Sequence, residues 1–506
     1  MKNRDSNTGL REKTINLLFP LFTLSLLLFS NGRFSIFIAT WISAALLLNL
    51  VRRHKAIKGF FIAWLLLTFA WLFQFFGMVP LPLPFFFIIA LVYGLIGSIP
   101  YLLDLLLLKR KDQFLHTLIF PSAWAITEFL LQYTPYGSWG HTAYSQYNQL
   151  GLIQSVSLFG MSYITFLIAW SASTCNWALD NQMEWPKIRK GIRIFGGVIL
   201  ITMIYGNARL LFHHPQSKTV RIASISAMEK FDQKSDPELL ERFYANRLTK
   251  EDVQSVSREN NIVNNDLFEQ TKKEAIAGAE IVFWGEANGV VLKQKEDSLF
   301  QYTSSLAKQH NIYLGLGLGT MNPASEKPLE NKLVLFNPDG EISIDYWKAK
   351  PVPGPEKAIS ALKDTHIQTT DTPFGKIGSV ICFDMDFPQH LSQAGNLDIL
   401  LVPSNDWKEI DPWHTHMAKF RAIEQGFNMV RHTSNGLSSG FDYTGKALSE
   451  MDHYTNDERV LITIIPTKGV TTPYSVMGNI FPLFCLFLII FITARGNRLY
   501  MSNPKT

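Results

Sequence analysis

Apolar and polar stretches divide the chain into three parts. Long apolar runs follow one another from Thr14 to Phe212, residues of mixed polarity fill Gln216 to Lys468, and a last apolar run extends from Ile480 to Ala494. A helix needs about 20 mostly apolar residues to cross a bilayer, so the runs predict membrane helices. The predicted spans cover residues 14–31, 34–51, 59–77, 82–106, 114–132, 156–178, 192–211 and 477–495.

Lys and Arg residues gather in alternate connections between these spans. Basic clusters follow the second, fourth and sixth spans, and both chain ends are basic, whereas the connections after the third and fifth spans contain neither residue. Because basic loops stay in the cytoplasm, this pattern predicts that both termini are cytoplasmic. We therefore predict a seven-helix transmembrane domain at 1–212, an extracytoplasmic domain at 213–476, and a C-terminal transmembrane helix with a cytoplasmic tail at 477–506.

The region 213–476 alternates between short apolar runs and longer stretches of mixed charge. This alternation favours an α/β domain whose sheets are buried beneath helices. The predicted strands are Val220–Ile225, Ile281–Trp284, Ile312–Leu318, Leu333–Phe336, Ile342–Tyr346, Ile377–Ile381, Ile399–Val402, Met429–His432 and Val460–Ile465. The predicted helices cover residues 237–248, 264–278, 297–309 and 412–426.

Charge and cysteine content narrow the class of protein. The net charge of +5 does not indicate nucleic-acid binding, because the basic residues cluster between apolar runs, as in membrane proteins. Of the three cysteines, Cys175 and Cys485 lie within apolar runs, which argues against a disulfide framework or a zinc site. His414 and His416 are two residues apart on a predicted helix and so lie on different faces. Neither a metal nor a cofactor is expected.

The remaining cysteine, Cys382, follows the apolar run Ile377–Ile381 directly. The end of a buried strand holds the backbone rigid while its side chain reaches an open edge of the sheet, so Cys382 is a candidate nucleophile. The alternative is a small apolar core residue, which is the more common environment for a single cysteine. Glu286 and Lys348, each at the end of its own predicted strand, favour the nucleophile.

Glu286 and Lys348 each have two interpretations. Glu286 is either a general base, which requires burial and a raised pKa, or a solvated strand end. Lys348 and Lys350 are either solvated charges before a Pro/Gly loop or, for one of them, a source of positive charge for a developing oxyanion. The local pattern alone leaves both alternatives open.

Two glycine-containing stretches superficially match known motifs. Gly315–Thr320 lacks the Lys and the spacing of a phosphate-binding loop and alternates like a strand. Gly436–Gly440 has a serine between glycines, as in serine hydrolases, but it lies in a strand-like stretch with no helix after it. Neither stretch predicts a binding or catalytic site.

Glu128 interrupts the fifth predicted span. A carboxylate in hydrocarbon costs about 2.5–3.5 kcal/mol on insertion scales, so Glu128 is predicted to be functional or paired; alternatively it lies in water near the outer interface with Gln132. The loop that follows, Tyr133–Asn148, is rich in Tyr, Trp and Gly. Its aromatic residues, Trp139 among them, suit the lipid headgroup layer and indicate a surface where lipid is handled.

A Glu, a Lys and a Cys, each after a strand of one α/β domain, resemble the nitrilase superfamily. Pro403–Trp407, Phe420–Glu424 and Val430–Gly436, together with seven spans before the domain and one after it, resemble the membrane-embedded branch of bacterial apolipoprotein N-acyltransferases. Pro121–Trp124, Glu128 and Tyr144–Gln146 are similar too. The resemblance implies an α-β-β-α sandwich with a multi-pass α-helical membrane domain.

The resemblance also implies roles for individual residues. Glu286 is then the general base, Lys348 the oxyanion-stabilising lysine, Cys382 the nucleophile and Glu356, eight residues after Lys348, a supporting acid. Asp384 stands where the transferases usually carry Glu.

The chain departs from the family pattern at several positions. Gly285 replaces a Pro before the base, and the loop Pro353–Glu356 reads Pro-Gly-Pro-Glu where Pro-Phe-Gly-Glu is usual. The stretch Ala223–Ala227 replaces elements that handle substrate in the family.

The implied reaction moves an acyl chain from a phospholipid to the N-terminal amine of a diacylglyceryl-cysteine lipoprotein, through a thioester on the cysteine. The partners would be a phospholipid donor, a lipoprotein acceptor and the bacterial inner membrane, with the catalytic domain on the periplasmic side. Two alternatives remain. One is a membrane-anchored amidase or nitrilase that hydrolyses a C–N bond, and the other is a non-catalytic lipid-binding protein on the same fold.

Overall fold

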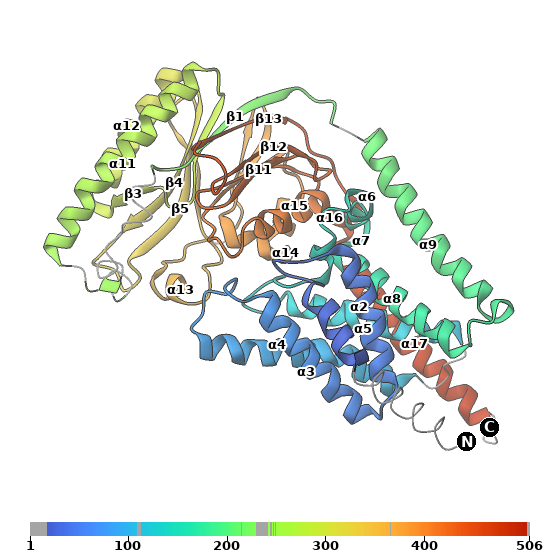
Figure 1. Cartoon of the computed structure of the whole chain (residues 1–506). Helices are drawn as coiled ribbons and strands as arrows, with labels where there is room; N and C mark the ends of the chain where they lie inside the picture. The colour runs from blue at the N-terminus through green and yellow to red at the C-terminus, as the bar shows by residue number, and fades with distance from the viewer. Residues whose placement is uncertain are drawn as a thin grey trace. The chain divides into compact units, whose positions relative to one another are not determined.

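The computed structural model describes residues 18–502 except 109–112, 214, 229–240, 243–244, 246, 248 and 365. The chain forms two compact units. The helical unit comprises Met1–Thr134, Ser138–Arg209 and Met477–Thr506, and the α/β unit comprises Pro135–Gly137 and Leu210–Val476. The strands of the described chain all belong to the α/β unit (Figure 1).

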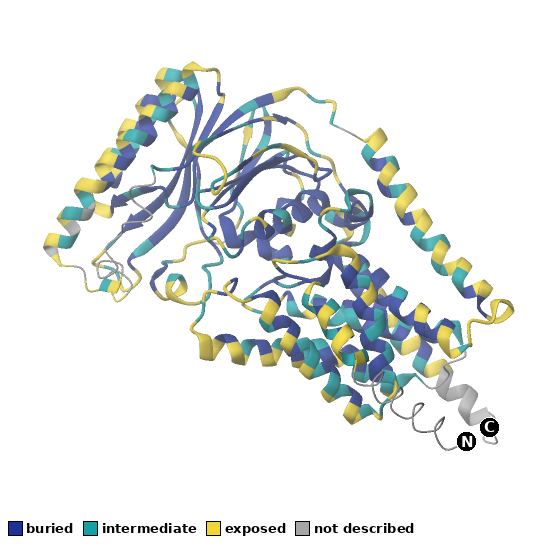
Figure 2. Cartoon of the chain, in the orientation of Figure 1, coloured by how far each residue is buried: buried dark blue, intermediate teal, exposed yellow. Residues whose placement is uncertain are grey.

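The helical unit contains long apolar helices. Within the described residues, four helices are long and apolar enough to cross a membrane, or five when a bent pair is counted as one span. The four are α3 (Ala56–Gln74), α4 (Leu83–Leu107), the continuous pair η1 (Phe114–Leu118) and α5 (Ile119–Leu131), and α9 (Trp185–Phe212). Large apolar side chains such as Phe85 and Ile201 are exposed on α4 and α9, as expected of faces that contact lipid (Figure 2). The protein is therefore a membrane protein.

The remaining predicted spans are shorter or interrupted. The bent pair joins α6 and α7, which occupy Leu150–Phe159, to α8 (Met161–Asp180) at an angle of 119°. Gly160 lies at this break with a φ of 70°. The apolar helices Leu18–Leu28, α2 (Phe37–Arg52) and Ile480–Arg495 of α17 (Ile480–Ser502) are 10–17 residues long. Eight crossings therefore stay a prediction.

The α/β unit contains two sheets. One has seven strands in the order β13-β1-β2-β4-β5-β6, with β3 paired to β4, and the other has six in the order β12-β11-β10-β9-β8-β7. The strands of the first sheet are β1 (Thr219–Ile225), β2 (Ile281–Trp284), β3 (Gly289–Leu292), β4 (Tyr313–Met321), β5 (Leu329–Phe336), β6 (Ile342–Trp347) and β13 (Val460–Pro466). Those of the second are β7 (Thr369–Thr372), β8 (Gly375–Ser379), β9 (Ile399–Ser404), β10 (Asn428–Thr433), β11 (Leu437–Phe441) and β12 (Ala447–Asp452).

The sheets pack face to face between helices. Helices α11 (Lys250–Ile276) and α12 (Glu296–His310) cover the outer face of the seven-stranded sheet, where Leu267 and Leu306 share a core with Trp284. A second core joins Phe283 of that sheet to Leu400 of the other and extends to α15 (Trp413–Gln425). Figure 1 shows this layering, which is the α-β-β-α sandwich predicted above.

The predicted strands correspond to strands of the structure, whereas β3, β7, β11 and β12 were not among them, although β11 overlaps the strand-like stretch Gly436–Gly440. Strand β7 has the polar sequence Thr-Thr-Asp-Thr at a sheet edge, and β12 is half exposed, so neither forms an apolar run. Helix α11 begins 14 residues before its predicted start at residue 264, at a capping box in which Thr249 and Asp252 exchange hydrogen bonds. The helix predicted at 237–248 lies largely outside the described residues.

The glycine-rich run belongs to β4, as its alternation predicts. Gly317 lies where β4 passes the end of β2, and a Cβ there would collide with the carbonyl oxygen of Gly285 and lie 2.7 Å from that of Trp284. Glu286 follows Gly285 directly. The missing side chain of Gly317 therefore lets β4 support the backbone that carries Glu286.

We predict that Gly317→Ala destabilises the protein by about 1–3 kcal/mol, because overpacking must push β4 away from β2. Gly319→Ala is the matched control on the same strand, since its Cβ would meet Ala287 at an ordinary 3.4 Å. Chemical unfolding of the full-length protein in detergent measures both. Equal stabilities for the two variants would contradict the close-approach argument.

Candidate active site

Cys382 occupies a strained turn at the end of β8. After Ser379 the backbone remains extended to Ile381 and then enters the short 3-10 helix η4 (Cys382–Asp386). Cys382 has a φ of 46°, a left-handed conformation that a non-glycine residue adopts only when its surroundings enforce it. The side chain is buried, with 3% of its surface exposed. This geometry fits a presented nucleophile better than a simple core residue.

The carboxylate of Asp384 holds this turn in place. It accepts hydrogen bonds from the backbone N–H of Ile381 at 2.9 Å, the backbone N–H of Lys350 at 2.7 Å and the hydroxyl of Tyr346 at 2.8 Å. Burial raises the pKa of Asp384 to about 6. Asp384 thus joins the turn that carries Cys382 to the segment that carries Lys348.

Glu286, Lys348 and Glu356 form a buried charge cluster. The Nζ atom of Lys348 lies 2.7 Å from an oxygen of Glu286 and 2.7 Å from an oxygen of Glu356. Asn331 of β5 donates a hydrogen bond to the same Glu286 oxygen at 2.7 Å. Glu356, at the start of α13 (Pro355–Ile359), also accepts from the N–H of Val352 at 2.9 Å. The structure therefore places the sequence-predicted Glu and Lys residues in direct contact.

The charges of this cluster act on the Cys382 thiol. Burial, reinforced by the negative charge of Glu286, raises the pKa of Cys382 well above its usual value, although the positive charge of Lys348 opposes this. Burial also raises the pKa of Glu286. Burial alone would lower the pKa of Lys348, but Glu286 and Glu356 raise it well above normal. At neutral pH the cysteine therefore rests as a thiol and needs a base to become a nucleophile.

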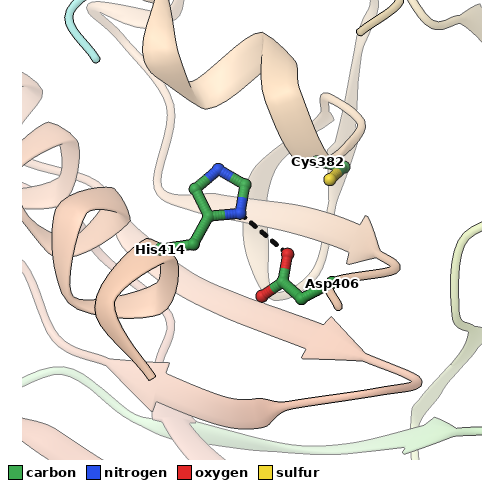
Figure 3. Close-up of side chains that lie close together, drawn as sticks. All are labelled: Cys382, Asp406 and His414. Carbon is green, nitrogen blue, oxygen red and sulfur yellow. Dashed lines mark hydrogen bonds and ion pairs between the residues drawn. The ribbon is translucent and has the colours of Figure 1, made fainter. Parts of the chain in front are cut away.

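A second charge cluster, not predicted from the sequence, also lies close to Cys382. Asp406, which follows β9, makes a two-pronged ion pair with Arg431 of β10 at 2.8 and 2.9 Å. The ring of His414 lies between Asp406, at 2.7 Å, and Asp386, at 3.2 Å. Figure 3 shows Cys382, Asp406 and His414 converging. Asp406 and Arg431 lie within two of the stretches that carry the family resemblance. That resemblance was the feature of the sequence that could have indicated this cluster.

This cluster has the donor atoms of a metal site but is arranged as an ion-pair network. One ligand atom each from Cys382, Asp406 and His414 lie within 4.8 Å of one another. However, both oxygens of Asp406 accept from Arg431, and both ring nitrogens of His414 contact carboxylates. A metal ion would have to displace these partners. Burial alone would lower the pKa of His414, but Asp406 and Asp386 raise it to about 9.

A cavity of about 510 Å³ lies at the same edge of the sandwich. Its lining includes Ala287, which follows Glu286, and Asn405, whose carbonyl oxygen lies 3.9 Å from the Cys382 sulfur. A volume of this size accommodates part of a substrate molecule. The site therefore combines a thiol, a base, a cation and a nearby cavity. Acyl transfer through a covalent intermediate requires these components.

Glu128 and Trp139 lie in the helical unit. Glu128 is buried and accepts hydrogen bonds from Trp124 at 3.1 Å, the Thr142 N–H at 3.0 Å and the Thr165 hydroxyl at 2.5 Å. His141 lies 3.1 Å from it, so Glu128 is paired rather than exposed to water. Trp139 is 7% exposed because its ring packs near Phe75, and its predicted location in the headgroup layer stays a prediction.

Comparison with known proteins gives two family matches. The apolipoprotein N-acyltransferase N-terminal domain matches residues 24–174, and the carbon-nitrogen hydrolase domain matches residues 254–471. Curated relatives named apolipoprotein N-acyltransferase include one from Wigglesworthia glossinidia brevipalpis, 26% identical over 74% of this chain and 73% of its own length. Another, from Haemophilus influenzae, is 21% identical over 80% of this chain and 79% of its own length.

Among solved structures, an amidase from Nesterenkonia sp. is similar to the chain. It is 17% identical and aligns with a TM-score of 0.37, covering 50% of this chain and 92% of the amidase.

We predict that the His414 cluster makes stability depend on pH. Because the pKa of His414 is raised in the folded protein, its stabilising effect is complete below about pH 6.5 and is lost as the pH rises towards 9. His414→Gln should remove this decline, which amounts to at most about 3 kcal/mol. His416→Gln, on the same helix, is the control: burial lowers the pKa of His416 to about 3, so it is neutral throughout this range.

The free energy of unfolding, measured between pH 6 and pH 9.5 for the wild type and both variants, checks this. An undiminished decline in His414→Gln would show that the cluster does not hold a protonated histidine.

Proposed function

The chain belongs to the apolipoprotein N-acyltransferase family of the nitrilase superfamily, and we propose that it transfers an acyl chain from a phospholipid to the N-terminal amine of diacylglyceryl-cysteine lipoproteins. The observation that carries this proposal is the buried thiol of Cys382, held in a strained turn where the charges of Glu286 and Lys348 act on it. An enzyme with this site is an acyltransferase that works through a thioester.

In the first half-reaction the carboxylate of Glu286 takes the proton of the Cys382 thiol, and the sulfur attacks the carbonyl carbon of a phospholipid ester. The carbonyl oxygen becomes an oxyanion, which Lys348 stabilises by charge and hydrogen bonding. When this intermediate collapses, the C–O bond breaks and the leaving alkoxide recovers the proton from Glu286. The products are a lysophospholipid and an acyl thioester on Cys382.

In the second half-reaction the neutral amine of the acceptor attacks the thioester carbonyl. Glu286 accepts a proton from the attacking nitrogen, and Lys348 again stabilises the oxyanion. Collapse forms the amide, breaks the C–S bond and returns the proton to the sulfur. Because Glu286 is a carboxylate and Cys382 a thiol both before and after, the cycle closes without any further reagent.

The helical unit explains how both substrates reach one sulfur. A phospholipid and a diacylglyceryl-modified lipoprotein both remain in the bilayer, so an enzyme anchored there meets them without extracting either. From the distribution of basic residues we further propose that the protein resides in the bacterial inner membrane with residues 213–476 on the periplasmic side. Glu356 and Asp384 serve this chemistry by fixing Lys348 and the turn that carries Cys382.

We predict that incubation with phospholipid alone leaves an acyl group on Cys382. Intact-protein mass spectrometry of the full-length enzyme should show one added acyl chain, which hydroxylamine removes. Cys382→Ala should show none and should lose all transfer, whereas Cys175→Ala, which removes a thiol of the helical unit, should behave as the wild type. Hydrolysis of the acyl group at equal rates with and without a lipopeptide amine would instead indicate an amidase.

We predict that Glu286→Gln lowers the rate of thioester formation by about 10²–10⁴-fold, the usual contribution of a positioned base. Glu330→Gln is the control, because Glu330 is another buried acid of the same sheet, paired with Lys293 and Lys332 at 2.8 Å. Its loss should affect stability and leave acylation within a few-fold of the wild type. Comparable losses in both variants would contradict a role for Glu286 as the base.

A further inference from the structure

The cavity near Cys382 is built from the ends of β1, β2, β9 and β10, of which the end of β2 carries Glu286. Ser226 follows β1, Ala287 follows Glu286, Asn405 precedes Asp406, and Ser434 follows β10. The carbonyl oxygen of Asn405 is the atom that lies 3.9 Å from the Cys382 sulfur. Cys382 itself does not line the cavity, but Asn405 contacts both the cavity and the sulfur, so a molecule bound there lies one residue away from the nucleophile.

Amides and hydroxyls form much of the wall. The Asn288 side chain accepts from the N–H of Ala227 at 2.6 Å and donates to the hydroxyl of Ser434 at 2.7 Å and to the carbonyl of Glu286 at 3.0 Å. Asn435 donates to the side-chain oxygen of Asn405 at 2.8 Å. These bonds hold a polar wall in place, whereas an acyl chain requires a continuous apolar groove.

The lining of the cavity carries an excess of negative charge. Asp457 and Glu458 line it and are exposed. Arg459 also lines it, but its guanidinium is bound to both oxygens of Asp266, at 2.7 and 3.3 Å, so that its charge is largely balanced. The imidazole of His453 completes the titratable groups of the lining. Negative charge attracts an ammonium group and repels a phosphate.

We propose that this cavity is the acceptor subsite, which binds the amine-bearing N-terminal residues of the polypeptide that receives the acyl chain. The inference rests on the proposed function and extends it, because it assigns the two substrates to different places. The amine enters past Asp457 and Glu458, and the first peptide groups lie along the polar wall that Asn288 braces. The phospholipid headgroup, which carries a phosphate, binds elsewhere.

The two half-reactions can be measured separately, which makes the assignment testable. The test variant is Asp457→Asn/Glu458→Gln, and the control is Asp339→Asn/Glu341→Gln, which removes two exposed acids from a turn of the same unit without touching the cavity. Thioester formation is followed with phospholipid alone. Transfer is then followed with a synthetic diacylglyceryl-cysteine lipopeptide added to the preformed thioester.

We expect the test variant to form the thioester at the wild-type rate and to require a three- to tenfold higher lipopeptide concentration for half-maximal transfer, about the effect of two exposed charges. Raising the salt concentration should reduce the difference between wild type and variant. The control should match the wild type in both steps. Because all four substituted residues are exposed, both proteins should fold.

Three outcomes would count against parts of this account, and they are distinguishable. A changed rate of thioester formation in the test variant would assign the cavity to the phospholipid headgroup, and unchanged kinetics in both steps would show that neither substrate uses it. Either result overturns the acceptor subsite while leaving the proposed function intact. Failure of the unsubstituted protein to form a thioester would overturn the proposed function itself.

Discussion

The site depends on the buried ion pair between Glu286 and Lys348. Removing two charges from water is costly, and their attraction offsets that cost only when hydrogen bonds satisfy the remaining atoms. Asn331 and Glu356 supply those bonds, at 2.7 Å each to Glu286 and Lys348 respectively. The pair therefore keeps a base and a cation at fixed positions in a site of low dielectric constant, where their charges act strongly on a neighbouring sulfur.

Opposing charges from two clusters act on Cys382. Burial and the charges of Glu286 and Asp406 raise the pKa of its thiol, while Lys348 and Arg431 lower it. The balance keeps the sulfur protonated at neutral pH. Both clusters are anchored by residues that fix the backbone as well, since Asp384 ties the cysteine turn to Lys350 and His414 ties Asp386 to Asp406. The residues that surround the Cys382 thiol with charge are therefore held by the same contacts that fix the strained backbone at Cys382.

The sequence predicted the core strands and the residues at their ends because short apolar runs are visible without knowledge of the fold. Glu286, Lys348 and Cys382 could be selected for that reason, although only the family resemblance assigned their roles. The cluster of Asp406, His414 and Arg431 was missed because its members come together only when β9, β10 and α15 pack. Polar edge strands such as β7 carry no apolar signal. The burial of Trp139 likewise depends on tertiary packing that its loop sequence does not encode.

The central claim is that Cys382 rests as a thiol beside a charged Glu286, and the pH dependence of its alkylation tests this most directly. Iodoacetamide reacts with the thiolate, so the rate of Cys382 modification reports the ionisation of the sulfur. The account predicts a rate that is low at neutral pH and still rises above pH 9, and an inflection at lower pH in Glu286→Gln, where the neighbouring negative charge is removed. A wild-type rate that reaches its plateau below pH 8 would contradict it.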